Sequence, residues 1–155
     1  MAGTYHITTE PARHLVRIVL GGFFEPDDVT AFGLALRDAC AALPCAPNAH
    51  LTLMDCAALH IQTQAAVAAF AAVAQDPVVR SRRAAVVVGK SLVHAQARRV
   101  YQHKRDNLGF FRDREKAEAW LLAAGVSAAQ TASRYRHVPV SPRSADHGCT
   151  VPNGA

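Results

Sequence analysis

The sequence predicts an α/β fold: a single domain with a small, mixed, mostly parallel sheet and helices around it. Short apolar runs alternate with longer segments of helical periodicity, which is typical of parallel strand–helix–strand units. The run AAVVV at 84–88 has no polar residue, as expected for a strand buried on both faces. A length of 155 residues fits one domain with or without a tail.

The chain opens with two short strands. Residues 5–9 alternate weakly, and residues 14–20 are rich in the β-branched residues that strands favour. Gly21 and Gly22 are expected to end the second strand. Because only a turn at 10–13 separates the two runs, we expect an antiparallel hairpin.

A first helix is predicted from about residue 25 to 43. Pro26 suits the first turn, and the acidic residues beside it oppose the positive end of the helix dipole. Pro44 ends the segment. Its larger apolar residues recur at spacings of three and four and form one stripe: Val29, Phe32, Leu36, Cys40 and Leu43.

The middle of the chain predicts a strand, a loop and a second helix. Residues 51–54 form a short apolar strand that ends at Asp55, and an irregular connection at 56–62 follows. Thr63 can cap a helix that runs to about residue 75. Because alanine fills much of this helix, it can pack closely against the sheet.

The last elements repeat the alternation. After the strand at 84–88, a helix is predicted from Ser91 to about 104, then a strand at 108–111 and a helix that Asp113 caps. The expected order is β-β-α-β-α-β-α-β-α.

The polarity of the chain changes after this last helix. We expect one domain over residues 1–126 and a polar, partly disordered tail over 127–155, where proline, serine and arginine replace large apolar residues.

Several classes of protein are excluded at this stage. No apolar run approaches the ~18 residues that a membrane span needs, and the first ten residues do not have the pattern of a secretory signal. We therefore expect a cytoplasmic protein with free thiols, since no CxxC pair occurs among its four cysteines: Cys40, Cys45, Cys56 and Cys149.

The positive charge is concentrated in one stretch. The net charge is +5, and residues 80–105 hold eight basic side chains and no acidic one. Such a stretch could meet an acidic partner or a phosphate, or it could be a plain solvated surface. We do not expect nucleic acid as a partner, because Tyr101 is the only aromatic residue there for base stacking.

Gly89-Lys90-Ser91 lies between a strand and a helix, the position of a phosphate-binding loop. The full motif needs a glycine five positions earlier, where this chain has alanine, so nucleotide hydrolysis is not expected. Lys90 and Ser91, with His94 and Arg98 on the following helix, could still hold an anion. The alternative is that Ser91 only caps the helix.

Asp55, His60 and Thr63 fall in one strand-to-helix connection, at the edge of a parallel sheet where ligands usually bind. They could form a regulatory or docking site, or His60 could be a surface histidine and Thr63 a helix cap. No G-x-S-x-G motif and no metal-ligand spacing of histidines or cysteines occurs. We expect no enzymatic activity, no cofactor and no metal.

Two segments carry a family resemblance: AAVVVG at 84–89 and NLGFFRDREKAEAWLL at 107–122. Through them the chain resembles, over about residues 5–124, bacterial STAS-like proteins of the anti-sigma-factor-antagonist, or STAS/CRAL-TRIO, type. The resemblance implies a STAS-like fold without an assigned enzymatic reaction, and a role in protein docking or in apolar-ligand binding.

The resemblance also points to one modification site. Antagonists of this type are phosphorylated on a serine or threonine after the third strand, behind an aspartate and ahead of a small residue and a glycine. The matching stretch is Gln62-Thr63-Gln64-Ala65, which keeps the hydroxyl but has neither the aspartate nor the glycine.

Two functions therefore stay open. The first is a regulatory module that docks a protein partner through the connection before the second helix. The second is a binder of a small apolar or anionic ligand, with Lys90 and Arg98 on an acidic group and an apolar pocket near Phe23, Phe24 or Phe70. An exposed edge strand could also pair in a homodimer.

Overall fold

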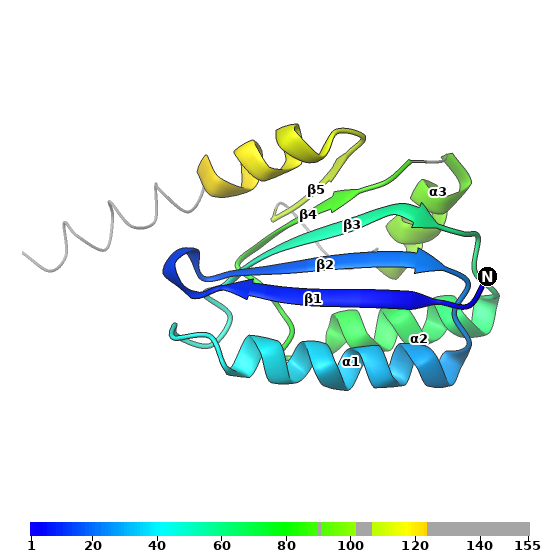
Figure 1. Cartoon of the computed structure of the whole chain (residues 1–155), viewed down its shortest axis with the longest axis horizontal. Coiled ribbons are helices and arrows are strands. Elements are labelled where there is room, and N and C mark those ends of the chain that lie inside the picture. Colours follow the sequence, from blue (N-terminus) through cyan, green and yellow to red (C-terminus); the bar gives the residue numbers. More distant parts are fainter. Residues whose placement is uncertain (90, 102–106, 124–155) are drawn as a thin grey trace, which may run out of the picture.

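In the computed structural model, five strands form one sheet with helices on both faces (Figure 1). The structure describes residues 1–89, 91–101 and 107–123, so the predicted tail and Cys149 lie outside it. A helix over 114–123 follows the named elements. These are, in chain order, β1 (Thr4–Glu10), η1 (Pro11–Arg13), β2 (Leu15–Gly22), α1 (Pro26–Ala41), β3 (Leu51–Leu59), α2 (Gln64–Gln75), β4 (Arg83–Val87), α3 (Ser91–Val100) and β5 (Leu108–Phe111).

The strands lie in the sheet in chain order, β1-β2-β3-β4-β5. β1 pairs antiparallel with β2, and each later pair of neighbours is parallel. The predicted hairpin, the mostly parallel sheet and the alternation of strands and helices are confirmed.

Two strands extend further than the sequence predicts. The sequence predicts that the second strand ends at Leu20, before Gly21 and Gly22, and that the third ends at Asp55. Instead, Gly21 pairs with Ala58 and Gly22 pairs with Leu59, so β2 and β3 stay side by side for several more residues.

A β-bulge explains the extension of β3. Val19 pairs with Asp55, but Gly21 pairs with Ala58, so the register shifts by one residue between them. Inside the bulge, the N–H of Ala57 donates to Oδ1 of Asp55 at 3.0 Å. The acidic side chain therefore stabilises the bulge from within the strand, where the sequence pattern suggested that the strand stops.

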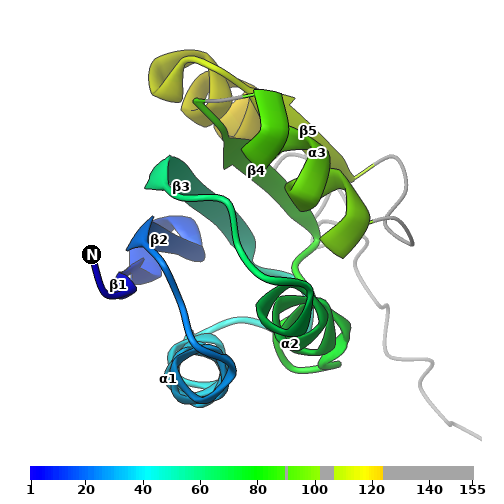
Figure 2. The same ribbon diagram turned by 90° about the vertical axis from the view of Figure 1, so that its right-hand side faces the viewer.

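Helices α1, α2 and α3 pack on one face of the sheet, and the 114–123 helix packs on the other (Figure 2). Alternate strand residues serve the two faces: Ile18 and Met54 belong to the core under α1 and α2, while Leu15 and Leu53 belong to the core under the 114–123 helix. No helix in the described ranges is both long and apolar enough to cross a bilayer.

Helices α1 and α2 approach closely because Gly33 of α1 has no side chain where it meets α2. A Cβ atom on Gly33 would lie 2.6 Å from Cγ2 of Val73, so only glycine fits at this point of α1. Nearby, the ring of Phe32 lies 6.0 Å from that of Phe70. The predicted stripe is confirmed, since its members are all buried. α1 ends at Ala41, however, so Leu43 lies two residues beyond the helix that we expected to reach it.

The 114–123 helix is fixed to the sheet by charged contacts. The guanidinium of Arg17 on β2 donates two hydrogen bonds to Glu118 and one, of 2.8 Å, to Glu10. The guanidinium of Arg83 on β4 stacks 3.4 Å above the ring of Trp120. The hydrogen bond from Arg17 lowers the pKa of Glu118.

Replacing Glu118 with Gln should make stability less dependent on pH. Because the pKa of Glu118 is lower in the folded chain, its ionised form stabilises the fold above pH ~4.3, the ordinary glutamate value. This contribution disappears as pH falls through the lowered pKa. Chemical denaturation should show a loss of about 1 kcal/mol in the free energy of unfolding at pH 7, shrinking toward zero in acid.

The matched control is Glu115→Gln, because Glu115 is an exposed residue of the same helix. It should leave the free energy of unfolding within about 0.5 kcal/mol of the wild type at both pH values. An equal loss in both variants would contradict the role given to Arg17 and Glu118.

Candidate functional site

The carboxyl ends of β2, β3 and β4 meet at one edge of the sheet, where α2 and α3 begin. Thr63 sits between β3 and α2, and its Oγ1 accepts the N–H of Ala66 at 3.1 Å. The helix-cap interpretation of Thr63 is therefore confirmed. The residue remains exposed, so the cap does not hide it from a partner.

Gln62 is the best-connected side chain of this edge. It is only 7% exposed. Its Oε1 accepts the N–H of Phe24 at 2.8 Å, and its Nε2 donates to the carbonyls of Gly22 and His60 at 3.0 and 2.7 Å. Its own backbone N–H and C=O pair with the side-chain amide of Gln96 on α3, at 2.8 and 2.7 Å.

The Gln62 and Gln96 pair therefore ties β2, the β3–α2 connection and α3 together. The sequence analysis missed this pair, because a lone glutamine in a loop matches no motif and its partner lies 34 residues further on. A buried amide with this many partners holds its surroundings in one arrangement, because leaving a partner unpaired would cost free energy.

The expected group of Asp55, His60 and Thr63 is spread over both faces of the sheet. Oδ2 of Asp55 lies 3.9 Å from Nη1 of Arg114, which belongs to the helix on the opposite face from α2. The side chain of His60 is exposed beside Thr63. His60 and Thr63 thus share the carboxyl edge, while Asp55 supports the bulge and the ion pair behind it.

Two large apolar side chains are exposed at the same edge. Ile61 is 49% exposed and Leu92, in the first turn of α3, is 64% exposed. Each is close in sequence to a member of the Gln62–Gln96 pair, and that pair fixes the two segments beside one another. We call His60, Ile61, Thr63 and Leu92 the carboxyl-edge surface.

The expected anion site is described only in part. Lys90 and the side chain of Ser91 lie outside the described residues. The ring of His94 lies 5.0 Å from that of Phe110 on β5, so this histidine packs against the sheet. Arg98 is exposed. Anion binding by these four residues stays a prediction.

The described cysteines are free thiols, and two of them are buried. Burial raises the pKa of Cys56 to about 12 and that of Cys40 to about 11. Both are therefore protonated and poor nucleophiles at neutral pH. Within the described ranges, no three His, Cys, Asp or Glu side chains are placed to hold a metal ion.

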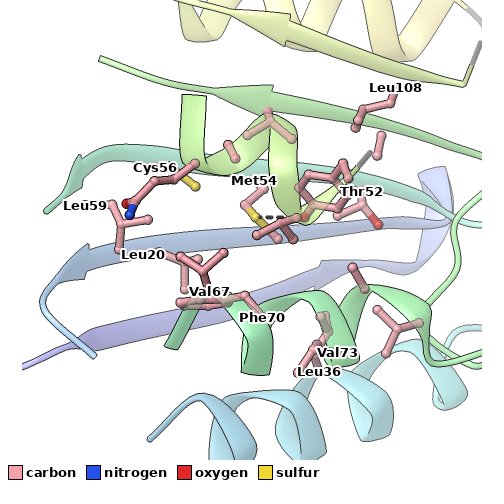
Figure 3. A pocket seen from close by; sticks show the side chains of 18 of the residues that line it. Leu20, Leu36, Thr52, Met54, Cys56, Leu59, Val67, Phe70, Val73 and Leu108 are labelled. Carbon is pink, nitrogen blue, oxygen red and sulfur yellow. Dashed lines mark hydrogen bonds between the residues drawn. The ribbon is translucent and has the colours of Figure 1, made fainter. Parts of the chain in front are cut away.

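A partly open cavity of about 80 Å³ lies between the sheet and the helices on its α2 side (Figure 3). Phe70, one of three phenylalanines expected near a pocket, lines it. Phe24 is buried in the core with its ring 5.3 Å from that of Phe70. Phe23 pairs instead with the start of the chain, donating its N–H to the carbonyl of Met1 at 3.0 Å.

No protein-family model matches the chain, and no curated protein matches it. A solved structure from Shewanella loihica PV-4, an uncharacterized protein of the DUF3478 family with a SpoIIAA-like fold, is similar to it. The similarity covers 77% of this chain and 94% of that one, with a TM-score of 0.60 and 17% identity. This chain has a SpoIIAA-like fold.

A second structure with a similar fold is an anti-sigma factor antagonist from Mycobacterium paratuberculosis. It is 13% identical, covers 77% of this chain and 93% of its own, and has a TM-score of 0.56. The resemblance to STAS-like proteins is thus confirmed at the level of the fold. At such identities the SpoIIAA-like fold is all that the similarity shows.

Replacing Gln62 with Leu should destabilise the protein more than the same replacement at an exposed glutamine. Leucine has a similar size but removes the partner of the Phe24 N–H and of the His60 carbonyl. The Gly22 carbonyl loses the Gln62 amide but still accepts the N–H of His60 at 3.0 Å. We expect a loss of about 2–3 kcal/mol in the free energy of unfolding, measured by chemical denaturation. Gln64→Leu, at an exposed position of α2, is the control and should change it by less than about 0.5 kcal/mol. Equal effects would refute the central position of Gln62.

Proposed function

We propose that this protein is a non-enzymatic regulatory module that docks a protein partner on its carboxyl-edge surface. The observation that carries the proposal is the exposure of Ile61 and Leu92 beside a connection that two partly buried hydrogen bonds with Gln96 hold in place. Large apolar side chains that are exposed on neighbouring segments are a feature of protein interfaces.

The rigidity of this surface favours docking. Gln62, which directly follows Ile61, is hydrogen-bonded to Gln96, and Gln96 lies one helical turn after Leu92. A surface already fixed in place loses little conformational entropy when a partner binds. The anti-sigma factor antagonist with a similar fold supports the regulatory part of the proposal, as an analogy of fold.

Two observations favour a non-enzymatic role. Asp55 forms its ion pair with Arg114 on the opposite face of the sheet, so it does not orient His60. The buried thiols of Cys40 and Cys56 have raised pKa values and are not activated as nucleophiles.

Ile61→Asp should abolish partner capture, because it places a charge in the apolar centre of the surface. Leu34→Asp is a matched control, since Leu34 is 61% exposed but lies on α1. Immobilised wild type and both variants are incubated with lysate of the source organism, and the bound proteins are compared by quantitative mass spectrometry. We expect a partner retained by wild type and Leu34→Asp and reduced at least tenfold with Ile61→Asp, at unchanged melting temperatures.

Identical retained proteins for all three forms would contradict docking at this surface. A Thr63→Glu variant in the same comparison tests regulation by phosphorylation. A negative charge suits a helix N-terminus, so this variant should stay folded. Loss of the partner with Thr63→Glu would support a phosphorylation switch, and full retention would oppose it.

A further inference from the structure

The cavity exists because small residues line it where larger ones could stand. Ala74 on α2, Ala84 on β4 and Ala97 on α3 all face it. Its volume of about 80 Å³ is several times the ~10–15 Å³ that a single water molecule needs. Since an unfilled cavity lowers stability in proportion to its volume, a chain that keeps one gives up stability for it.

The lining of the cavity is mostly aliphatic and carries no formal charge. Labelled side chains in Figure 3, among them Leu20, Met54 and Val67, surround the space from the sheet and from α2. Among the described lining residues there is no Lys, Arg, His, Asp or Glu. A charged ligand would find no counter-ion there, and burying it would cost too much free energy.

Tyr101, at the end of α3, supplies a polar group to this apolar space. Its hydroxyl donates to Sδ of Met54 at 3.4 Å, and a thioether is a weak acceptor. Burial raises the pKa of Tyr101, so the phenol keeps its proton. A stronger acceptor could therefore replace the Met54 sulfur as the partner of this O–H.

We propose that the cavity binds a small, uncharged, apolar molecule with one hydrogen-bond acceptor, such as a carbonyl oxygen, which receives the O–H of Tyr101. The apolar body of the ligand fills the space left by the alanines, and its acceptor replaces the Met54 sulfur. The cavity shares Gln62 and Gln96 with the carboxyl edge, but none of the four residues of the carboxyl-edge surface lines it, so its test does not depend on protein docking. It also differs from an anion site at Lys90 and Arg98, because its lining excludes anions.

Methionine methyl NMR gives a direct test, because the chain has two methionines. Met54 lines the cavity, while Met1 is 89% exposed and serves as an internal reference. Protein labelled with ¹³C on its methionine methyl groups is titrated with acetone and, separately, with isobutene, which are small enough for a cavity of about 80 Å³. The two probes have the same shape, but only the ketone has an acceptor oxygen.

We expect both probes to shift the Met54 signal and to leave the Met1 signal in place. Tyr101→Phe should weaken acetone binding about fivefold, the value of one hydrogen bond, and leave isobutene binding within a factor of two. Ala97→Leu should abolish binding of both probes by filling the cavity, whereas Ala72→Leu, on the exposed side of α2, should not.

Two results would overturn the proposal. An unmoved Met54 signal at the highest concentration of each probe that leaves the protein folded would exclude a ligand site in the cavity. Equal weakening of both probes in Tyr101→Phe would exclude the hydrogen bond that selects an acceptor. Tyr101→Phe keeps the aromatic ring, so the test stands even if Ala97→Leu fails to fold.

Discussion

The carboxyl edge of the sheet depends on the buried amide of Gln62. Where strands end, backbone N–H and C=O groups lose their ladder partners, and burial without new partners would be costly. The Gln62 side chain satisfies three such groups, and its own peptide groups are satisfied by Gln96. The end of β2, the turn into α1 and the start of α2 and α3 are therefore positioned by one side chain and its partner.

This arrangement accounts for the surface that we assign to docking. With Gln62 drawn inward, its neighbour Ile61 is left half exposed, and Thr63 is in place to cap α2. The same pair fixes α3 so that Leu92 faces solvent. Apolar exposure at this edge thus follows from the need to satisfy buried polar groups behind it.

The alanine-rich composition also determines how the helices pack on the sheet. The chain has 31 alanines among 155 residues, and many of them lie in the helices over the sheet. Gly33 lets α1 approach Val73 of α2, and the small side chains of Ala74 and Ala97 leave space between α2, α3 and the sheet. Close helix packing and the cavity therefore both depend on small residues in the helices.

Much of the fold could be predicted from the sequence because it rests on local patterns. The alternation of strand and helix patterns gave the topology, and the cap at Thr63 could be identified from one hydroxyl before an alanine-rich helix. The extent of β3 could not, because the bulge after Asp55 depends on pairing with β2.

The candidate site was less predictable, since it depends on contacts across the chain. The connection before α2 was identified from its place in a parallel sheet, but Asp55 faces the helix behind it. Gln62 and Gln96 lie far apart in sequence, and neither residue type signals such a role. The cavity is defined by the space that several distant elements leave between them, which no single segment encodes.

Residue-resolved amide hydrogen exchange on the wild-type protein tests the central claim most directly. If Gln62 and Gln96 hold the carboxyl edge together, the amide protons of Gln62 and Phe24 should exchange as slowly as that of Met54 in the middle of β3. Exchange of the Gln62 and Phe24 amides at the rate of an unstructured peptide, with β3 still protected, would contradict it.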